Sequence, residues 1–297
     1  MGSEAHVPAP RSITALAVVL AAVTARASTP ALEPAAAATT SATQPASVER
    51  TGSAPAPAPR PPFVPPRPNE SMEFQVTYLG ISMGKVRIFS GQVDETTAPI
   101  FLQAQTTSIA AIVTLRQQLA SYIDVATGLP RSVSLDAVEG SYRHTDTVQY
   151  DRAANKAKVR EKGKFDNPYL IDVPPDTTDF MALVYRLRTL PLENGARYDF
   201  PVLSGRDLNH VIATVLGREK IETKAGTFQA VKIRVPTGFT GKFSEKDPTY
   251  LWLSDDDRRI VVRLTADFAI GNATMNLTSY RPGDVPAPAA QTKVATP

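Results

Sequence analysis

The sequence predicts an all-β, mainly antiparallel domain, built as a sandwich or as a partly open β-barrel with one amphipathic helix. Short segments in which apolar and polar residues alternate, rich in Val, Ile, Thr, Phe and Tyr, recur between residues 70 and 281. Turn signals separate these segments at short intervals. No helical pattern regularly follows a strand, which argues against a parallel, doubly wound sheet.

The predicted strands follow one another from the start of this region to its end. Hairpin or tight-turn signals stand at 152–155, 193–195, 224–226 and 254–257. Many short strands at such spacing are typical of antiparallel sheets. The predicted strands are 72–79, 85–93, 100–108, 115–125, 131–138, 144–151, 157–163, 197–203, 207–223, 227–235, 249–254, 258–266 and 269–280.

One segment, 176–195, has the period of a helix instead. Asp176 or Thr178 is the expected N-cap, and Pro191 with Asn194-Gly195 ends the pattern. An apolar stripe at helical spacing must be buried against a sheet or in the mouth of a barrel. The stripe consists of Phe180, Leu183, Val184, Leu187 and Leu190.

The two ends of the chain differ in composition from its middle. Residues 1–27 predict a secretory signal peptide, because Arg11 precedes the apolar run 13–23 and an A-x-A site follows at 25–27. The run is shorter than the roughly 20 residues that span a bilayer. We therefore expect a periplasmic or secreted protein with no transmembrane segment after cleavage.

Residues 28–69 are rich in Pro and Ala, and we expect a disordered linker that contributes nothing to the stability of the domain. Residues 282–297 have a similar composition and predict a disordered C-terminal tail. The folded domain is therefore expected to span residues 70–281.

Composition and motifs exclude several kinds of chemistry. The chain has no cysteine, which excludes disulfides, thiolate metal sites and a cysteine nucleophile. Its 32 basic and 29 acidic residues are interspersed, so we expect no nucleic-acid partner. His144 and His210 lie far apart and no zinc spacing occurs, so we expect no metal and no cofactor. G-x-S-x-G is also absent, and no catalytic residue can be assigned.

The stretch YLGISMGKVRI (78–88) resembles a phosphate-binding loop only superficially. A Walker loop requires G-x-x-x-x-G-K-[ST]. Three residues separate Gly80 from Gly84, and Val86 replaces the hydroxyl that would bind magnesium. Alternation on both sides predicts two strands with a sharp turn between Gly80 and Gly84.

A candidate ligand-binding segment lies at 236–248, which is long for a hairpin loop. It carries Phe239, Lys242 and Phe243, and Trp252 follows. In one hypothesis the two Phe rings close over a pocket, Lys242 approaches an anionic group and Trp252 lines the same site. In the alternative, the rings fold back onto the sheet and Trp252 belongs to the core.

Four landmarks occur in order: YLGISMGKVRI, DFMALVYRLRTLPLENG, GREKIETKAGTFQAVKI and YLWLSDDDRRIVVRLTADFAIG. In that order they resemble the Domain of Unknown Function 3108 family of exported bacterial proteins, over nearly all of 70–281. One departure is that Val261 or Val262 stands where the family often has proline. The resemblance implies an envelope-facing, mostly β protein and supplies no catalytic residue or cofactor. Its most specific parts are Arg218-Glu219 followed by Gly226-Thr227-Phe228, and Trp252 followed by the acidic turn and Arg259.

Three functional hypotheses remain open. The first is a non-catalytic envelope protein that binds a glycan or a lipid-like amphiphile. The second is a tethered scaffold that holds an envelope protein partner, and the third is an enzyme acting on polysaccharide. A deep apolar cavity favours the first, an exposed apolar patch over a filled core favours the second, and two close, buried carboxylates favour the third.

Overall fold

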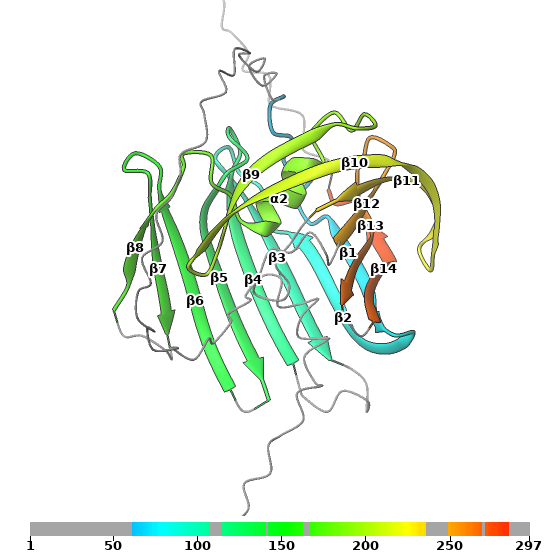
Figure 1. Cartoon of the computed structure of the whole chain (residues 1–297), viewed down its shortest axis with the longest axis horizontal. Helices are drawn as coiled ribbons and strands as arrows, with labels where there is room; N and C mark the ends of the chain where they lie inside the picture. Colours follow the sequence, from blue (N-terminus) through cyan, green and yellow to red (C-terminus); the bar gives the residue numbers. More distant parts are fainter. Residues whose placement is uncertain are drawn as a thin grey trace, which may run out of the picture.

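The computed structural model describes residues 61–106, 115–140, 142–162, 167–235, 249–268 and 271–284. These residues form a single antiparallel sheet of 14 strands and one helix, α2 (Phe180–Leu187) (Figure 1). The strands are β1 (Ser71–Tyr78), β2 (Ile81–Ser90), β3 (Thr97–Thr106), β4 (Leu115–Asp124), β5 (Pro130–Glu139), β6 (Tyr142–Asp151), β7 (Lys156–Lys162), β8 (Tyr169–Asp172), β9 (Arg197–Ser204), β10 (Asp207–Thr223), β11 (Gly226–Arg234), β12 (Thr249–Ser254), β13 (Val261–Phe268) and β14 (Gly271–Arg281).

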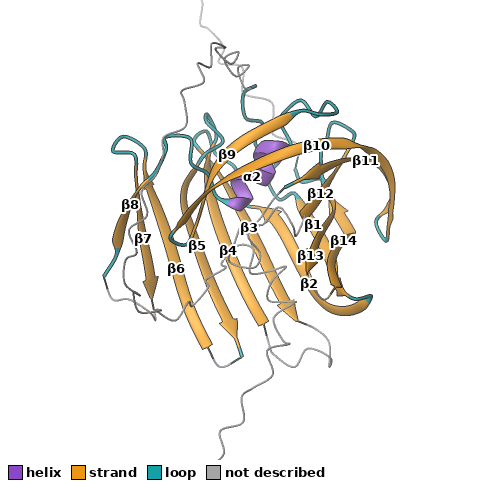
Figure 2. Cartoon of the chain, in the orientation of Figure 1, coloured by secondary structure: helices purple, strands orange, loops and turns teal. Residues whose placement is uncertain are grey.

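The sheet is open, with β8 at one edge and β9 at the other. Consecutive strands pair with one another except β8 and β9, and the pairing of β1 with β14 joins the two halves. The sheet curls around α2, which packs against both β4 and β9 (Figure 2). The predicted all-β fold class is confirmed. Of the two predicted forms, a sandwich and a partly open barrel, the single curled sheet corresponds to the partly open barrel.

Helix α2 is shorter than the predicted segment and starts at a different cap. Asp179 is the N-cap, and its Oδ1 accepts a hydrogen bond from the Ala182 amide at 2.9 Å. Thr178 cannot cap the helix because its backbone pairs with Pro201 and Leu203 along β9. The expectation of Asp176 or Thr178 as the cap was therefore wrong. In the described residues, no helix has the length and apolar character needed to cross a membrane.

The core lies on the inner face of the curled sheet and around the helix. In β1, Met72, Phe74 and Val76 are buried, whereas Glu73 is exposed, as period-two alternation requires. The expected apolar stripe of α2 is buried except for the partly buried Phe180. Met181, Ala182 and Tyr185 are buried as well, so the helix is enclosed on nearly all sides.

The packed unit begins before residue 70. Phe63 is buried in the main core cluster, although it lies in the segment expected to be a linker. Gly128 leaves room for it, because a Cβ on Gly128 would lie 2.8 Å from the Phe63 ring. The Pro68 carbonyl also accepts a hydrogen bond from the Asp284 amide at 2.7 Å. Residues 61–69 thus belong to the folded unit, contrary to the expectation that they add nothing to its stability.

YLGISMGKVRI forms the β1–β2 hairpin, as predicted, but the turn is tighter than expected. Leu79 and Gly80 are its two connecting residues, with φ of 49° and 79°. Positive φ at both positions is the type I′ geometry, which favours Asn-Gly. A left-handed leucine costs about 1–2 kcal/mol. Gly84 lies inside β2, where a Cβ would approach the Gln105 carbonyl oxygen to 2.4 Å.

A buried ion pair connects the end of α2 to the start of β1. Arg188 donates from Nη1 and Nη2 to the two carboxylate oxygens of Glu70, at 2.8 and 2.7 Å. Burial lowers the pKa of Arg188, but the hydrogen bonds and charge of Glu70 outweigh this effect and raise it. Burial and Glu70 together raise the pKa of Tyr280 to about 12, so its hydroxyl remains a donor to Glu70 at 3.2 Å.

Candidate functional site

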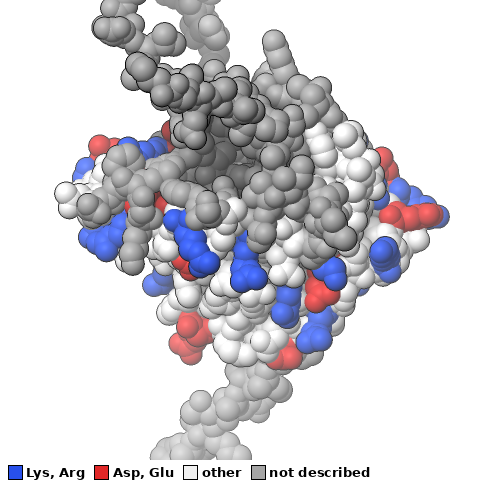
Figure 3. Space-filling model, turned by 90° about the horizontal axis from the view of Figure 1, so that it is seen from below, with Lys and Arg blue, Asp and Glu red and all other residues white. Residues whose placement is uncertain are grey.

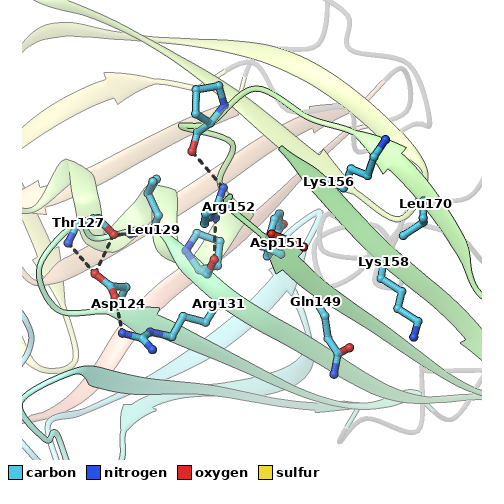
Figure 4. Close-up of a pocket in the computed structure, with 13 residues that line it drawn as sticks. Asp124, Thr127, Leu129, Arg131, Gln149, Asp151, Arg152, Lys156, Lys158 and Leu170 are labelled. Carbon is cyan, nitrogen blue, oxygen red and sulfur yellow. Dashed lines mark hydrogen bonds and ion pairs between the residues drawn. The ribbon is translucent and has the colours of Figure 1, made fainter. Parts of the chain in front are cut away.

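A groove of about 1000 Å³ lies at the end of the sheet where β4 turns into β5 and β6 turns into β7 (Figure 4). This volume is at the upper end of the range for small-molecule sites. The groove is lined by Asp124, Thr127, Leu129, Pro130, Arg131, Gln149, Tyr150, Asp151, Arg152, Lys156, Lys158, Leu170 and Pro175. Hereafter "the groove" refers to this set.

One side of the groove is a tightly hydrogen-bonded turn. Asp124 Oδ1 accepts from the amide and the hydroxyl of Thr127, each at 2.9 Å, and its Oδ2 lies 2.5 Å from Arg131 Nη2. Burial raises the pKa of Asp124, but the bonds from Thr127 and Arg131 outweigh burial and hold the pKa below its usual value. Asp124 is therefore an anion that keeps Arg131 in place.

Arg152 lies in the middle of the groove (Figure 4). Its guanidinium donates to the carbonyls of Pro130 at 2.6 Å and Pro175 at 3.3 Å, and it lies 4.4 Å from the centroid of the Tyr150 ring. Burial raises the pKa of Tyr150, with a contribution from Asp179, so the phenol stays neutral. Its buried hydroxyl has no hydrogen-bond partner among the residues that the structure describes.

The other side of the groove comes from β7 and β8. Lys156 Nζ lies 2.5 Å from Asp172 Oδ1, whereas Lys158 is exposed and has no carboxylate within ion-pair distance in the described part of the chain. Leu170 is 65% exposed beside them. Four lining residues are cationic (Arg131, Arg152, Lys156, Lys158) and two are acidic (Asp124, Asp151); with Asp172, which pairs with Lys156, the excess is one positive charge. This arrangement suits an anionic group joined to an apolar or sugar surface.

The groove is electrostatically connected to the start of α2 through Asp179. This buried carboxylate accepts from Ser121 Oγ at 2.7 Å in addition to the Ala182 amide. Burial raises the pKa of Asp179, and the hydrogen bonds and the positive charge of Arg152 only partly offset that rise.

The Asp179→Asn variant is expected to change the pH dependence of stability. Because the pKa of the Asp179 carboxyl is raised in the folded state, protonation of this carboxyl stabilises the folded state. This stabilisation is fully present below the unfolded pKa of about 4, and it is lost as the pH rises through the folded pKa. Asn keeps the cap but does not titrate. The unfolding free energy of the wild type minus that of the variant should therefore fall from about pH 4 toward neutral pH in urea titrations, and a constant difference would contradict the assignment.

Of the four sequence-predicted binding residues, Trp252 is the one that the structure describes, and it does not line the groove. Phe239, Lys242 and Phe243 are outside the described residues. Trp252 is almost fully buried on β12, where its indole Nε1 donates to Glu219 Oε1 at 2.5 Å. Lys232 Nζ lies 5.1 Å from the centroid of its ring. A ligand role for these four positions stays a prediction.

The residues that carry the family resemblance meet at one corner of the sheet. Asp255, in the acidic turn, accepts from Arg218 Nε at 2.7 Å and from Arg259 Nη1 at 2.9 Å. Arg218 also donates to Asn194 Oδ1 at 2.9 Å and to the Leu192 carbonyl at 3.1 Å. These bonds connect the segment after α2 with β10 and the β12–β13 turn, which indicates an architectural role.

A second polar cluster lies on the inner face of β6 and β7. Asp146 and Glu161 are direct register partners there, and Glu161 is 1% exposed. Arg206, from the β9–β10 turn, approaches Glu161 Oε2 to 3.4 Å, and His144 Nε2 lies 3.8 Å from Asp146 Oδ2. No group of three or more His, Asp or Glu side chains in the described ranges is arranged to hold a metal ion.

Sequence reasoning did not identify the groove, because its cations come from β5, the β6–β7 turn and β7. One local pattern could have indicated part of it. KAKVREK (156–162) alternates basic residues with Ala157, Val159 and Glu161, which are buried. Period-two alternation places the basic residues together on the opposite face of β7.

Comparison with known proteins supports the fold. The family model described as "Protein of unknown function (DUF3108)" matches residues 73–278. No curated protein matches the chain. A β-barrel-like protein of the Domain of Unknown Function DUF1849 from Brucella abortus is 9% identical, with a TM-score of 0.53 over 74% of this chain and 100% of that one. At this identity, the likeness concerns the fold alone.

Two further solved structures are more distant. One is reported as a "putative lipoprotein" from Parabacteroides distasonis, 10% identical, with a TM-score of 0.32 over 74% of this chain and 99% of that one. The other is reported as a "putative exported protein with YmcC-like fold" from Bacteroides fragilis, 10% identical, with a TM-score of 0.33 over 74% of this chain and 98% of that one.

Proposed function

The chain belongs to the DUF3108 family of proteins of unknown function, and from this premise we propose that it is an exported, non-catalytic cell-envelope protein that binds an anionic glycan or amphiphile in the groove. The observation that carries the proposal is the excess of cations around a groove of about 1000 Å³. Export is supported by the signal-peptide pattern of residues 1–27.

Arg152 is the residue best placed to recognise the anionic group. A guanidinium has five N–H donors, and the carbonyls of Pro130 and Pro175 occupy one donor on each terminal nitrogen. These two bonds hold Arg152 in place before a ligand arrives, which lowers the entropic cost of binding. Lys158 adds a charge without a carboxylate partner among the described residues.

The apolar residues of the groove indicate which class of molecule carries the anionic group. Leu129 and Leu170 flank the cations, together with Pro130 and Pro175. An acyl chain or the apolar face of a sugar ring can cover these surfaces, whereas a free inorganic anion cannot. We therefore place the ligand among acidic glycans and anionic amphiphiles.

Calorimetric titration of the full chain tests this proposal. The probes are dihexanoyl phosphatidylglycerol below its micelle concentration, the matching phosphatidylcholine, and tetragalacturonic acid. Arg152→Gln is expected to weaken binding of the anionic probe about tenfold or more, because a hydrogen bond to a charged group contributes roughly 1.5–3 kcal/mol. Lys158→Gln should weaken it less, and Lys224→Gln, in the exposed β10–β11 turn, is the matched control.

Equal affinity for the neutral and anionic lipids, or no binding of any probe, would contradict the proposal. A loss of affinity with Lys224→Gln equal to that with Lys158→Gln would show that overall charge, and not the groove, is responsible. A melting temperature close to that of the wild type must accompany each variant.

An enzyme acting on polysaccharide is the second candidate, and the opposed carboxylates of Asp146 and Glu161 favour it. Glycoside hydrolysis uses two carboxyl groups, one as acid and one as base or nucleophile. Release of reducing ends from an acidic polysaccharide, abolished by Glu161→Gln and retained in Lys158→Gln, would favour this candidate over the non-catalytic one.

A further inference from the structure

The β1–β2 hairpin presents two large apolar side chains at its tip. Leu79 is 60% exposed and Ile81 is 55% exposed. Isolated exposed apolar residues are ordinary on protein surfaces, but these two flank the same turn. Leu79 also occupies a left-handed position that Asn would fill with less strain. The turn therefore keeps an exposed leucine despite its steric cost.

A row of cations crosses the outer face of the sheet at the same end of the strands. The register runs from Lys85 on β2 through Gln105 and Arg116 to Val138 and Arg143 on β6. Lys85, Arg116 and Arg143 are all exposed. Since neighbouring strands lie about 4.8 Å apart, cations two strands apart recur roughly every 10 Å along this row.

Among the side chains that the structure describes, cations outnumber acidic groups on this part of the face. Arg87 and Arg160 add two exposed cations, and Glu73 and Asp136 are the acidic side chains described on the same part of the face. Asp136 accepts a hydrogen bond from Thr145 at 2.7 Å. None of the five cations lies within ion-pair distance of a carboxylate among the side chains that the structure describes, which do not include that of Glu139.

The tip and the row lie near the same end of the strands. Lys85 lies four residues from Ile81 along β2, and Arg116 and Arg143 are the second residues of β4 and β6. Figure 1 shows the hairpin tip at this lower end of the strands, and Figure 3, which looks at that end, shows Lys and Arg side chains interspersed with Asp and Glu on the described surface. The groove lies at the opposite end of β5, β6 and β7.

We propose that this lower end is a peripheral docking surface for an anionic lipid bilayer. Leu79 and Ile81 enter the boundary between headgroups and acyl chains, while Lys85, Arg116 and Arg143 contact lipid phosphates. Binding to membrane surfaces commonly combines buried apolar area with attraction of basic residues to anionic headgroups. A soluble polyanion would satisfy the cations but would leave both apolar side chains in water. The orientation leaves the groove facing away from the bilayer.

Vesicle flotation with the full chain tests the inference, and the groove variant Lys158→Gln separates this surface from the groove. The wild type is expected to float with vesicles of phosphatidylcholine containing 30% phosphatidylglycerol and not with pure phosphatidylcholine. Each cation near an anionic surface strengthens binding roughly fivefold. The triple variant Lys85→Gln/Arg116→Gln/Arg143→Gln should therefore lower the partition coefficient at least tenfold.

The apolar tip has its own variant and control. Leu79→Asn suits the type I′ turn, so the melting temperature should be unchanged or higher, while binding to the anionic vesicles falls by roughly three- to tenfold. Leu216→Asn, an exposed leucine on β10, is the matched control and should bind like the wild type.

Three results would overturn the inference. Failure of the wild type to float with anionic vesicles would do so directly. Unchanged binding in Leu79→Asn, with soluble polygalacturonate competing as well as vesicles do, would assign the face to a polyanion. Loss of flotation in Lys158→Gln but not in the triple variant would assign lipid binding to the groove.

Discussion

Arg188→Met is expected to lower the free energy of unfolding by about 3–5 kcal/mol, the usual result of leaving a buried charge without its partner. Glu70 is 3% exposed and receives both terminal nitrogens of Arg188. Among the described residues, the variant leaves its carboxylate with the weaker bond from Tyr280 as its side-chain contact. Urea denaturation at neutral pH measures the change.

The double variant Glu70→Leu/Arg188→Met distinguishes a lost charge partner from a lost contact. Replacing both partners of a buried ion pair with apolar residues is often neutral or stabilising, so the double variant should recover most of the loss. Arg197→Met, an exposed arginine on β9, is the control and should change stability by less than about 0.5 kcal/mol. A single variant as stable as this control would show that the ion pair contributes nothing.

Leu183→Ala and Leu187→Ala are each expected to cost about 2–5 kcal/mol. Both side chains are fully buried, on a helix that packs between β4 and β9. Truncation leaves a cavity that the enclosed helix cannot close, because sheet surrounds it. Thermal and urea unfolding measure the loss, and Leu216→Ala on the exposed part of β10 is the control. Unchanged melting in both variants would show that the helix is not a structural part of the core.

The two Leu variants are not expected to be additive. Leu183 and Leu187 are one helical turn apart and belong to the same core cluster, so the second truncation removes a side chain whose surroundings the first truncation has already loosened. The double variant should therefore lose less stability than the sum of the single losses.

The predicted strands were recovered well where alternation is strong. The predicted strand 207–223 coincides with β10 (Asp207–Thr223). The helical stripe and its burial were also correct, because a buried face imposes its period on the local sequence. The helix start was less predictable, because Thr178 pairs with β9, which follows about 20 residues later. The local sequence around Thr178 does not show whether this residue caps the helix or pairs with β9.

Two other features also depended on distant contacts. Phe63 stands alone in a proline-rich segment, and only the space above Gly128 explains its burial. Arg131, Arg152 and Lys158 are separated by turns, and the register of β5, β6 and β7 brings them to one groove. Basic residues that are interspersed with acidic ones in the sequence therefore form a cationic groove and a cationic row only because strand pairing brings them together.

By itself, the sequence determined the fold class, the helix, the family resemblance and the hairpin formed by YLGISMGKVRI. Period and turn chemistry are local properties, so they can be seen in any short stretch of chain. The tertiary structure decided that one sheet curls around the helix, that Glu70 meets Arg188, and where the groove and the docking surface lie. These features require residues far apart in the chain to meet, and their free energy depends on burial and pairing that exist only in the folded state.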